Sequence, residues 1–205
     1  MNRNDSEFDI LIKIVIIGDS GVGKSNYLYR FVEGRFISVH EATIGFDYKS
    51  KTSVLPKSKK KVKFQIWDTA GQEKYMSINK NLFQRVQGII LMYDITKQKT
   101  FNNLGRWMDS INELAGGIPL ILVGNKIDLI DERNVPKEKG EQFARDNNIK
   151  FFESSGKSGV NVEDSFNYLG EQIFIQNYTE DIKSVGSDYN IRKDLTYIKK
   201  KKKCC

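Results

Sequence analysis

The chain has 205 residues and a formal net charge of +7 at pH 7. This length is enough for one well-packed domain, and no run of 18 apolar residues is present, which excludes a helix that spans a membrane. Lys199–Lys203 supply five of the seven net charges, so the basicity is concentrated in one segment and is not a surface-wide footprint for nucleic acid.

The first predicted element is a buried strand over Ile10–Ile17, a short, apolar and β-branched run. Gly18–Ser25 follows and fits the pattern G-x-x-x-x-G-K-[ST] of a phosphate-binding loop, and a helix is predicted over Asn26–Glu33. Glycines let successive N–H groups surround a phosphate, the lysine adds a positive charge, and the serine hydroxyl can bind magnesium. The residues predicted here to bind nucleotide are Asp19, Ser20, Gly21, Val22, Gly23, Lys24, Ser25 and Asn26.

The next segment, 35–43, is polar and without periodicity, which predicts a loop. A hydroxyl from Thr43 can complete the coordination of magnesium when a terminal phosphate draws this loop in. Phe36 can pack against a nucleotide base, or it can instead be a loop residue tucked into the core. Strands are predicted over 45–55 and 61–67, and they form a hairpin.

Asp68-Thr69-Ala70-Gly71-Gln72-Glu73 follows the hairpin. A carboxylate at the carboxyl end of a strand, opposite a phosphate-binding loop, predicts that Asp68 holds magnesium through water. Gly71 lets its backbone N–H approach a terminal phosphate, and Gln72 can orient the attacking water, as a catalytic residue together with Lys24. Taken alone, this motif could also be a polar turn before a helix.

The remaining elements alternate between strands and helices. Near-continuous apolar runs over 88–94 and 118–124 are typical of central parallel strands, and a short last strand is predicted over 150–153. Helices are predicted over 100–114 and 136–147 and after Asn161, which is expected to cap the last one. The order β-α-β-β-α-β-α-β-α-β-α predicts an α/β fold, with helices on both faces of a six-stranded, mostly parallel sheet that has one antiparallel edge strand.

Two further motifs follow strand ends, where ligands bind in such sheets. In Asn125-Lys126-Ile127-Asp128 the Asp128 carboxylate can accept the two adjacent N–H donors of a guanine edge, and the stem of Lys126 can cover the base. Backbone N–H groups of Ser154-Ser155-Gly156-Lys157 can meet a purine oxygen, and Lys157 can stack over the base. An ordinary Ser/Gly turn would have the same sequence as this last motif. We expect Asn125, Lys126, Asp128, Ser155, Gly156 and Lys157 to bind nucleotide.

Together, these motifs in this order resemble the small GTPase superfamily, and their details resemble the Rab family. The segments that carry the Rab resemblance are Ile44–Lys49, Phe64–Glu73 and Tyr93–Thr96, with the Cys-Cys end. The resemblance implies the G domain of a P-loop NTPase that binds GDP or GTP with Mg²⁺, hydrolyses GTP slowly without an activating protein, and regulates vesicle traffic. Loops around Thr43 and Gly71 would be held by the terminal phosphate and released on hydrolysis.

The resemblance also implies partners and a place in the cell. The partners would be effectors, an exchange factor, a GTPase-activating protein, a prenylation escort and a GDP-dissociation inhibitor. Prenyl groups on Cys204 and Cys205, helped by Lys199–Lys203, would hold the protein on the cytoplasmic face of a membrane. The lysines alone could also be a solvated tail or a nuclear localisation signal. We expect a cytosolic and membrane-anchored monomer that does not bind nucleic acid.

The expected organisation is a flexible N-terminus over 1–8, a G domain over 9–177, and a largely disordered tail over 178–205. Three features depart from the Rab pattern: Gly156 replaces an alanine, His40 replaces a tyrosine, and the segment after Tyr75 diverges. The glycine adds backbone freedom that could weaken nucleotide retention.

Two other functions fit parts of the sequence. One is a GTP-binding scaffold with little hydrolysis, which the presence of Gln72 disfavours. The other is a P-loop ATPase or nucleotide kinase, which Asp128 disfavours because adenine lacks the adjacent pair of donors.

Overall fold

The structure is a computed structural model that describes residues 8–38, 46–69 and 86–178. The chain divides into two units, Met1–Ile173 and Phe174–Cys205. The fold below is that of the first unit. In the second unit, residues 174–178 are described and continue a helix.

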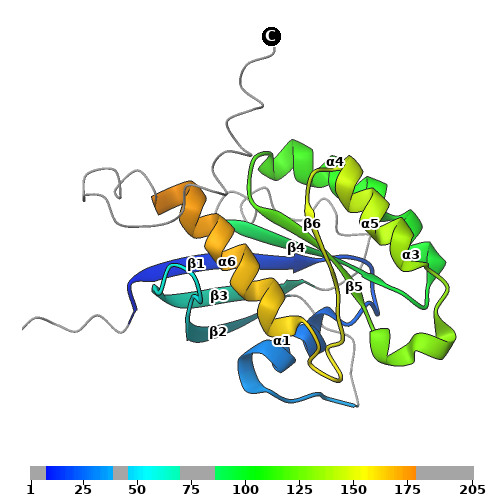
Figure 1. The fold of residues 1–205 in the computed structure, drawn as a ribbon, viewed down its shortest axis with the longest axis horizontal. Helices are drawn as coiled ribbons and strands as arrows, with labels where there is room; N and C mark the ends of the chain where they lie inside the picture. The colour runs from blue at the N-terminus through cyan, green and yellow to red at the C-terminus, as the bar shows by residue number, and fades with distance from the viewer. Residues whose placement is uncertain (1–7, 39–45, 70–85, 179–205) are drawn as a thin grey trace, which may run out of the picture. The chain divides into compact units, whose positions relative to one another are not determined.

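The first unit is built on a six-stranded sheet with the order β2-β3-β1-β4-β5-β6. Only the β2–β3 pair is antiparallel, and the other neighbours are parallel. The predicted α/β fold with one antiparallel edge strand is therefore confirmed (Figure 1). The strands are β1 Ile10–Ile17, β2 Phe46–Val54, β3 Lys61–Thr69, β4 Gly88–Asp94, β5 Leu120–Asn125 and β6 Lys150–Glu153. The helices are α1 Lys24–Glu33, α3 Gln98–Asn102, α4 Leu104–Ala115, η2 Ile127–Glu132, α5 Lys137–Asp146 and α6 Val162–Tyr178.

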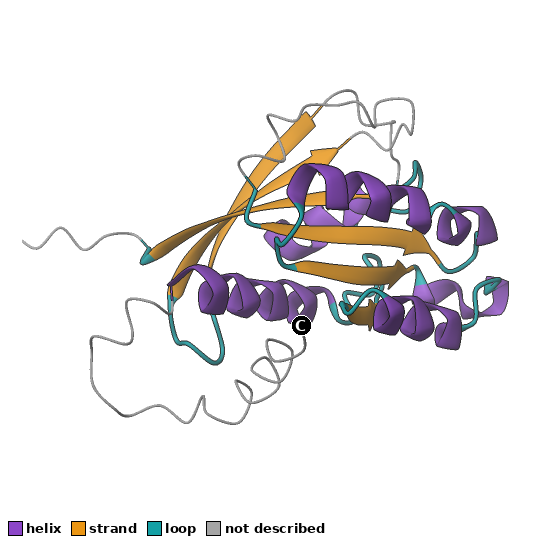
Figure 2. Cartoon of the chain, turned by 90° about the horizontal axis from the view of Figure 1, so that it is seen from above, coloured by secondary structure: helices purple, strands orange, loops and turns teal. Residues whose placement is uncertain are grey.

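Helices cover both faces of the sheet (Figure 2). The continuous burial of residues 14–17 in β1 requires this, because successive side chains of a strand point to opposite faces. Val15 and Ile17 belong to a core with α4, which contributes Leu104 and Ile111. On the other face, α1, β3 and α6 meet through aromatic rings. Phe31 stacks on Phe166 with ring centroids 3.8 Å apart and meets Phe64 edge-on at 5.5 Å. The sheet is thus buried between two layers, and its polar strand ends are left for the site.

The helix predicted over 100–114 is two helices in the structure, and the break lies at Asn103. The side-chain amide of Asn103 donates to the carboxylate of Asp19 at 2.6 Å. Asn103 therefore contacts the first loop of the chain. The spacing of apolar residues does not predict this contact.

The other helix starts differ from prediction by small amounts. Pro136 lies directly before α5, not inside it. Asn161 lies directly before α6, but its side-chain amide donates back to the carbonyl of Glu153 at 2.7 Å. The helix expected between β3 and β4 lies outside the described residues. Among the helices that the structure describes, none is long and apolar enough to cross a membrane.

Tyr93 on β4 leads to a prediction about stability. Its side chain is fully buried, and among the described residues its hydroxyl has no hydrogen-bond partner. We expect Tyr93→Phe to raise the free energy of unfolding by up to about 1 kcal/mol, because it removes an unsatisfied buried hydroxyl. Burial also raises the pKa of Tyr93 well above its usual 10.0. The unfolded state therefore ionises first, so wild type loses stability above pH 10 and the advantage of the variant widens there. Urea unfolding at pH 8 and pH 11 measures both effects. A difference in unfolding free energy between Tyr93→Phe and wild type that is the same at pH 8 and pH 11 would contradict this account.

Candidate nucleotide-binding site

The predicted motifs converge on one edge of the sheet, at the carboxyl ends of the parallel strands. In the register of the sheet, Asp94 at the end of β4 lies beside Asn125 at the end of β5. Asp68 near the end of β3 lies beside Ile16, two residues before Gly18. Residues far apart in sequence therefore share one rim.

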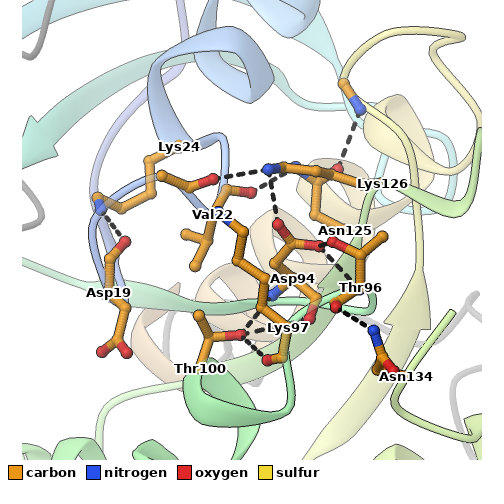
Figure 3. Close-up of polar contacts among 12 residues, drawn as sticks. Asp19, Val22, Lys24, Asp94, Thr96, Lys97, Thr100, Asn125, Lys126 and Asn134 are labelled. Carbon is orange, nitrogen blue, oxygen red and sulfur yellow. Dashed lines mark hydrogen bonds and ion pairs between the residues drawn. The ribbon is translucent and has the colours of Figure 1, made fainter. Parts of the chain in front are cut away.

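The loop over Gly18–Gly23 joins β1 to α1 in a conformation that needs glycine. Gly18 and Gly23 have φ values of 140° and 96°, and a Cβ on Gly18 would lie 2.2 Å from the carbonyl oxygen of Met92. The Lys24 ammonium donates to the carbonyls of Gly18 and Asp19, both at 2.8 Å (Figure 3). Lys24 is only 5% exposed, so its charge is held over the loop.

Asn125 joins this loop to two other motifs. Its side-chain nitrogen donates to the carbonyl of Val22 at 2.8 Å, and its side-chain oxygen accepts from the N–H of Gly156 at 3.1 Å. A Cβ on Gly23 would lie 2.6 Å from the same side-chain nitrogen. The amide of Asn125 therefore fixes the spacing between the first loop and the last motif (Figure 3).

Lys126 forms a second brace across the site. Its ammonium donates to the carbonyl of Gly21 at 2.7 Å and pairs with the carboxylate of Asp94 at 2.6 Å (Figure 3). Asp94 is fully buried, and its other oxygen accepts from the N–H and the hydroxyl of Thr96. The lysine stem is thereby stretched along the rim.

Asp128 and the last motif are held together by Ser155. The Ser155 hydroxyl donates to the Asp128 carboxylate at 2.5 Å and accepts from the N–H of Lys157 at 3.1 Å. Asp128 is exposed, while Ser155 is fully buried. An exposed carboxylate with a fixed orientation can accept hydrogen bonds from a ligand.

The expected backbone freedom at Gly156 is restricted by two contacts. Its N–H donates to Asn125, and its carbonyl accepts from Arg30 on α1 at 3.0 Å. A Cβ at Gly156 would lie 3.3 Å from the backbone nitrogen of Tyr27, which is tight. The glycine thus permits close packing of the last motif on α1.

Asp19 was predicted to bind nucleotide, but its carboxylate faces the protein. It is 7% exposed and accepts from Trp107 Nε1 at 2.9 Å and from Asn103 Nδ2 at 2.6 Å. Only its backbone remains for a ligand. The carbonyl of Asp19 accepts from Lys24. The contacts of the carboxylate with Trp107 and Asn103 anchor the loop to the start of α4.

We expect Asp19→Ala to lower the free energy of unfolding by about 2–4 kcal/mol, because it leaves the buried donor of Trp107 and the half-buried donor of Asn103 without an acceptor. In a Trp67→Phe background, Trp107 is the one remaining tryptophan, so its emission spectrum should shift in the same variant. Chemical unfolding and fluorescence measure both effects. Asp109→Ala, an exposed acid on α4, is the matched control. If Asp19→Ala unfolded and fluoresced like the control, the carboxylate of Asp19 would not anchor the loop to α4.

The other predicted residues lie around this rim or outside the described part. The side-chain amide of Asn26 exchanges two hydrogen bonds with the backbone of Ile37, at 3.0 and 3.1 Å. Phe36, beside it, is 38% exposed, so it is not tucked into the core. Thr43, Gly71, Gln72, Cys204, Cys205 and His40 lie outside the described residues, as does the segment after Tyr75.

Sequence reasoning missed four supporting residues: Arg30, Asp94, Asn103 and Trp107. Of these, only Asp94 could have been found from the sequence, because a carboxylate at the end of a central strand is expected to lie near the ligand. Arg30 and Trp107 lie on helices, and Asn103 lies between α3 and α4.

The oxygen atoms of the protein at this rim are too few to bind magnesium without further oxygen atoms from a bound ligand. Asp68 is 1% exposed, and Ser25 stands at the start of α1. No group of three or more His, Cys, Asp or Glu side chains within residues 8–38, 46–69 and 86–178 could hold a metal ion. Hard oxygen ligands plus phosphate oxygens are the usual environment of Mg²⁺, so these residues fit the ion with a bound nucleotide.

Comparisons with known proteins agree with this geometry. The family model described as the Ras family matches residues 13–175. Ras-related protein Rab-10 of Diplobatis ommata is 42% identical over 199 residues, covering 97% of each chain. Ras-related protein Rab-13 of Rattus norvegicus is 44% identical over 170 residues, covering 82% of this chain and 83% of its own. The GTP-binding protein ypt3 of Schizosaccharomyces pombe is 40% identical over 213 residues, covering 98% and 99%.

Proposed function

This chain belongs to the Ras family and to its Rab branch, and on that premise we propose how its own residues bind and hydrolyse GTP. As a Rab-like small GTPase, it binds guanine nucleotide, hydrolyses GTP and regulates membrane traffic. One observation carries the assignment of roles below. Asn125 and Lys126 connect the phosphate loop, Asp94 and the last motif into a single preorganised rim.

The phosphates are bound by the loop before α1. Its backbone N–H groups and the positive end of the helix dipole attract anionic oxygens. The Lys24 ammonium has two carbonyl partners in this structure, and phosphate oxygens would replace them as stronger, charged acceptors. Lys24 thus stabilises the charge that develops on the transferred group.

The base is read by the motifs at the ends of β5 and β6. Asp128 accepts the two adjacent N–H donors of guanine, and its orientation is supported by the bond from Ser155. The stem of Lys126, whose ammonium is fixed between Gly21 and Asp94, covers one face of the base. For a backbone N–H of the last motif to meet the purine oxygen, it would have to exchange its present acceptor, which is Asn125 for Gly156 and Ser155 for Lys157. Lys157 and Phe36 complete the surroundings of the base.

Ser25, Thr43 and, through water, Asp68 would hold the metal ion. Bound there with nucleotide, Mg²⁺ would neutralise charge on the phosphate oxygens. The burial of Asp68 supports this role, because a buried carboxylate favours a cationic partner.

Hydrolysis requires a positioned water, and we assign that task to Gln72. The backbone N–H of Gly71 would approach the terminal phosphate, and Thr43 would help to hold the metal ion that binds the same phosphate. Loss of that phosphate releases both segments. The chain has no evident arginine that acts in cis, so unassisted turnover is slow and an activating protein completes the site.

Gln72→Leu tests whether the chain is a catalytic switch or a GTP-loaded scaffold. We expect the variant to bind GTP as wild type does but to hydrolyse it at least about tenfold more slowly, because the attacking water loses its orienting group. Single-turnover hydrolysis of GTP measures the rate. Gln98→Leu is a suitable control, since that glutamine lies on α3. Equal rates in Gln72→Leu and wild type would favour the scaffold.

We assign partners by class and the anchor by sequence. Rab membership suggests effectors, exchange factors, GTPase-activating proteins and a GDP-dissociation inhibitor, and we add a prenylation escort. The G domain would span 9–177, and 178–205 would carry prenyl groups on Cys204 and Cys205. Two lipid chains give stable anchoring where one is marginal. Intact mass of the protein from a eukaryotic host tests this, with Cys204→Ser/Cys205→Ser as the unmodified reference.

A further inference from the structure

A second group of lysines lies in the turn between β2 and β3. Lys57, Lys59, Lys60 and Lys61 are all exposed, and we call them the turn lysines. With Lys63, they place five positive charges in the stretch 56–63, which contains no acidic residue. This stretch and Lys199–Lys203 together hold ten positive charges, more than the net +7 of the chain. The rest of the chain is therefore net negative, at −3.

An ordered turn displays these lysines. Leu55 is fully buried and donates its N–H to the carbonyl of Lys60 at 2.9 Å, while Lys59 donates its N–H to the carbonyl of Leu55 at 3.0 Å. The N–H of Asp9 donates to the carbonyl of Lys61 at 2.7 Å, and the N–H of Lys61 donates to the side-chain carboxylate of Asp9 at 2.8 Å. Within the described ranges, the side chains of Lys59, Lys60 and Lys61 form no ion pair.

The turn lies at the opposite end of the sheet from the nucleotide site. β3 runs parallel to β1 and begins at Lys61, so the turn that precedes it lies beside the start of β1 (Figure 1). The phosphate loop follows the other end of β1. A surface that binds the turn would leave the nucleotide end open to effectors and regulators.

The helix that leads into the C-terminal segment reaches this same end. Glu171 on α6 is 4% exposed, and one carboxylate oxygen accepts from the N–H of Lys57 at 2.7 Å and of Ser58 at 3.0 Å. Ile173, two residues later, is the last residue of the first unit, and it packs near Gly88 at the start of β4. The first unit therefore ends beside the turn lysines, and Lys199–Lys203 and the terminal cysteines come later in the sequence.

We propose that the turn lysines bind the anionic headgroups of a phospholipid bilayer, as a second basic contact beside the C-terminal anchor. The proposal rests on the membrane anchoring proposed above. It is favoured over an acidic protein partner because the last helical turn of the first unit, with Glu171, lies at the same end of the sheet as the turn, and the anchoring segment follows it in the sequence. Each lysine near an anionic surface contributes about fivefold to binding. Headgroup contact at the turn would point the nucleotide end away from the bilayer.

Vesicle binding by the full, unprenylated chain tests the electrostatic contact without the lipid anchor. The variant is Lys59→Gln/Lys60→Gln/Lys61→Gln, and the matched control is Lys137→Gln/Lys139→Gln/Lys150→Gln, which removes the same charge from exposed lysines of α5 and β6. On phosphatidylcholine vesicles that contain phosphatidylserine, we expect the turn variant to bind at least about tenfold more weakly than the control. The difference should vanish in high salt and on phosphatidylcholine alone.

Lysine acetylation mapped by mass spectrometry on wild type gives a second measurement that needs no variant. Lys59–Lys61 should be protected by the anionic vesicles, and Lys137 and Lys139 should not. Equal binding of the turn and control variants to anionic vesicles, or equal acetylation of Lys59–Lys61 with and without vesicles, would overturn the proposal. Binding of acidic proteins or nucleic acid would then be the better explanation for the cluster of lysines in the turn. Absence of prenyl groups on Cys204 and Cys205 would refute the lipid anchor. The vesicle experiment uses unprenylated protein, so its result would still decide whether the turn lysines bind anionic headgroups.

Discussion

Replacing Lys24 with alanine is expected to lower the affinity for GDP and GTP by about 100- to 1,000-fold. Hydrogen bonds to charged groups contribute roughly 1.5–3 kcal/mol each, and Lys24 is placed to make such bonds to the outer phosphates. Its ammonium is already desolvated, at 5% exposure, and is held between the carbonyls of Gly18 and Asp19. The substitution also leaves those two carbonyls without their donor, so some stability is lost as well, and the loss of binding must be measured apart from it. Titration with a fluorescent GDP analogue, beside urea unfolding of the nucleotide-free protein, separates the two.

Lys139→Ala is the charge-matched control, because Lys139 is exposed on α5 and remote in sequence from every motif of the site. It should bind nucleotide like wild type. A Lys24→Ala protein whose affinity stays within about threefold of this control would show that the loop does not bind phosphate through its lysine.

Asn125→Ala is expected to have the second large effect, on stability and on binding together. The substitution leaves the carbonyl of Val22 and the N–H of Gly156 buried without their partner, at a cost of about 2–4 kcal/mol in unfolding free energy. It also releases the phosphate loop from the last motif, so nucleotide affinity should fall by about tenfold or more, since small displacements of a preorganised site are costly.

Urea unfolding and analogue titration test this with Asn112→Ala as control, since Asn112 is exposed on α4. If Asn125→Ala weakened nucleotide binding with no loss of stability in the nucleotide-free protein, the two hydrogen bonds would not hold the rim together. Asn125 would then act only through the ligand.

The sequence was sufficient to predict the parts of this fold that depend on local order. The apolar strand over 10–17, the glycine-rich loop and Lys24 are contiguous, and their chemistry is visible without a structure. The alternation of strands and helices then placed the later motifs at one edge, because parallel strands end on the same side. The register of Asp94 beside Asn125 agrees with that reasoning.

The supports of the site could not be predicted, because they depend on side-chain packing between distant segments. Asp19 is predicted as part of the phosphate-binding loop, but the sequence does not indicate that its carboxylate binds Trp107, which is 88 positions away. Arg30 reaches the carbonyl of Gly156 across 126 positions. In each case the pairing is set by how a helix lies on the sheet, and helical periodicity predicts that a face is buried but not which polar partner it meets.

The most direct test of the central claim is the identity of the nucleotide that copurifies with the protein. The protein would be denatured in EDTA-free buffer, the supernatant separated by ion exchange, and displacement of the bound nucleotide then compared with GTP and with ATP. We predict GDP, displaced by guanine nucleotides and not by ATP, since Asp128 is held by Ser155 with its carboxylate exposed. GTP in place of GDP would contradict hydrolysis by this chain. Adenine nucleotide, or displacement by ATP as readily as by GTP, would contradict the guanine site itself.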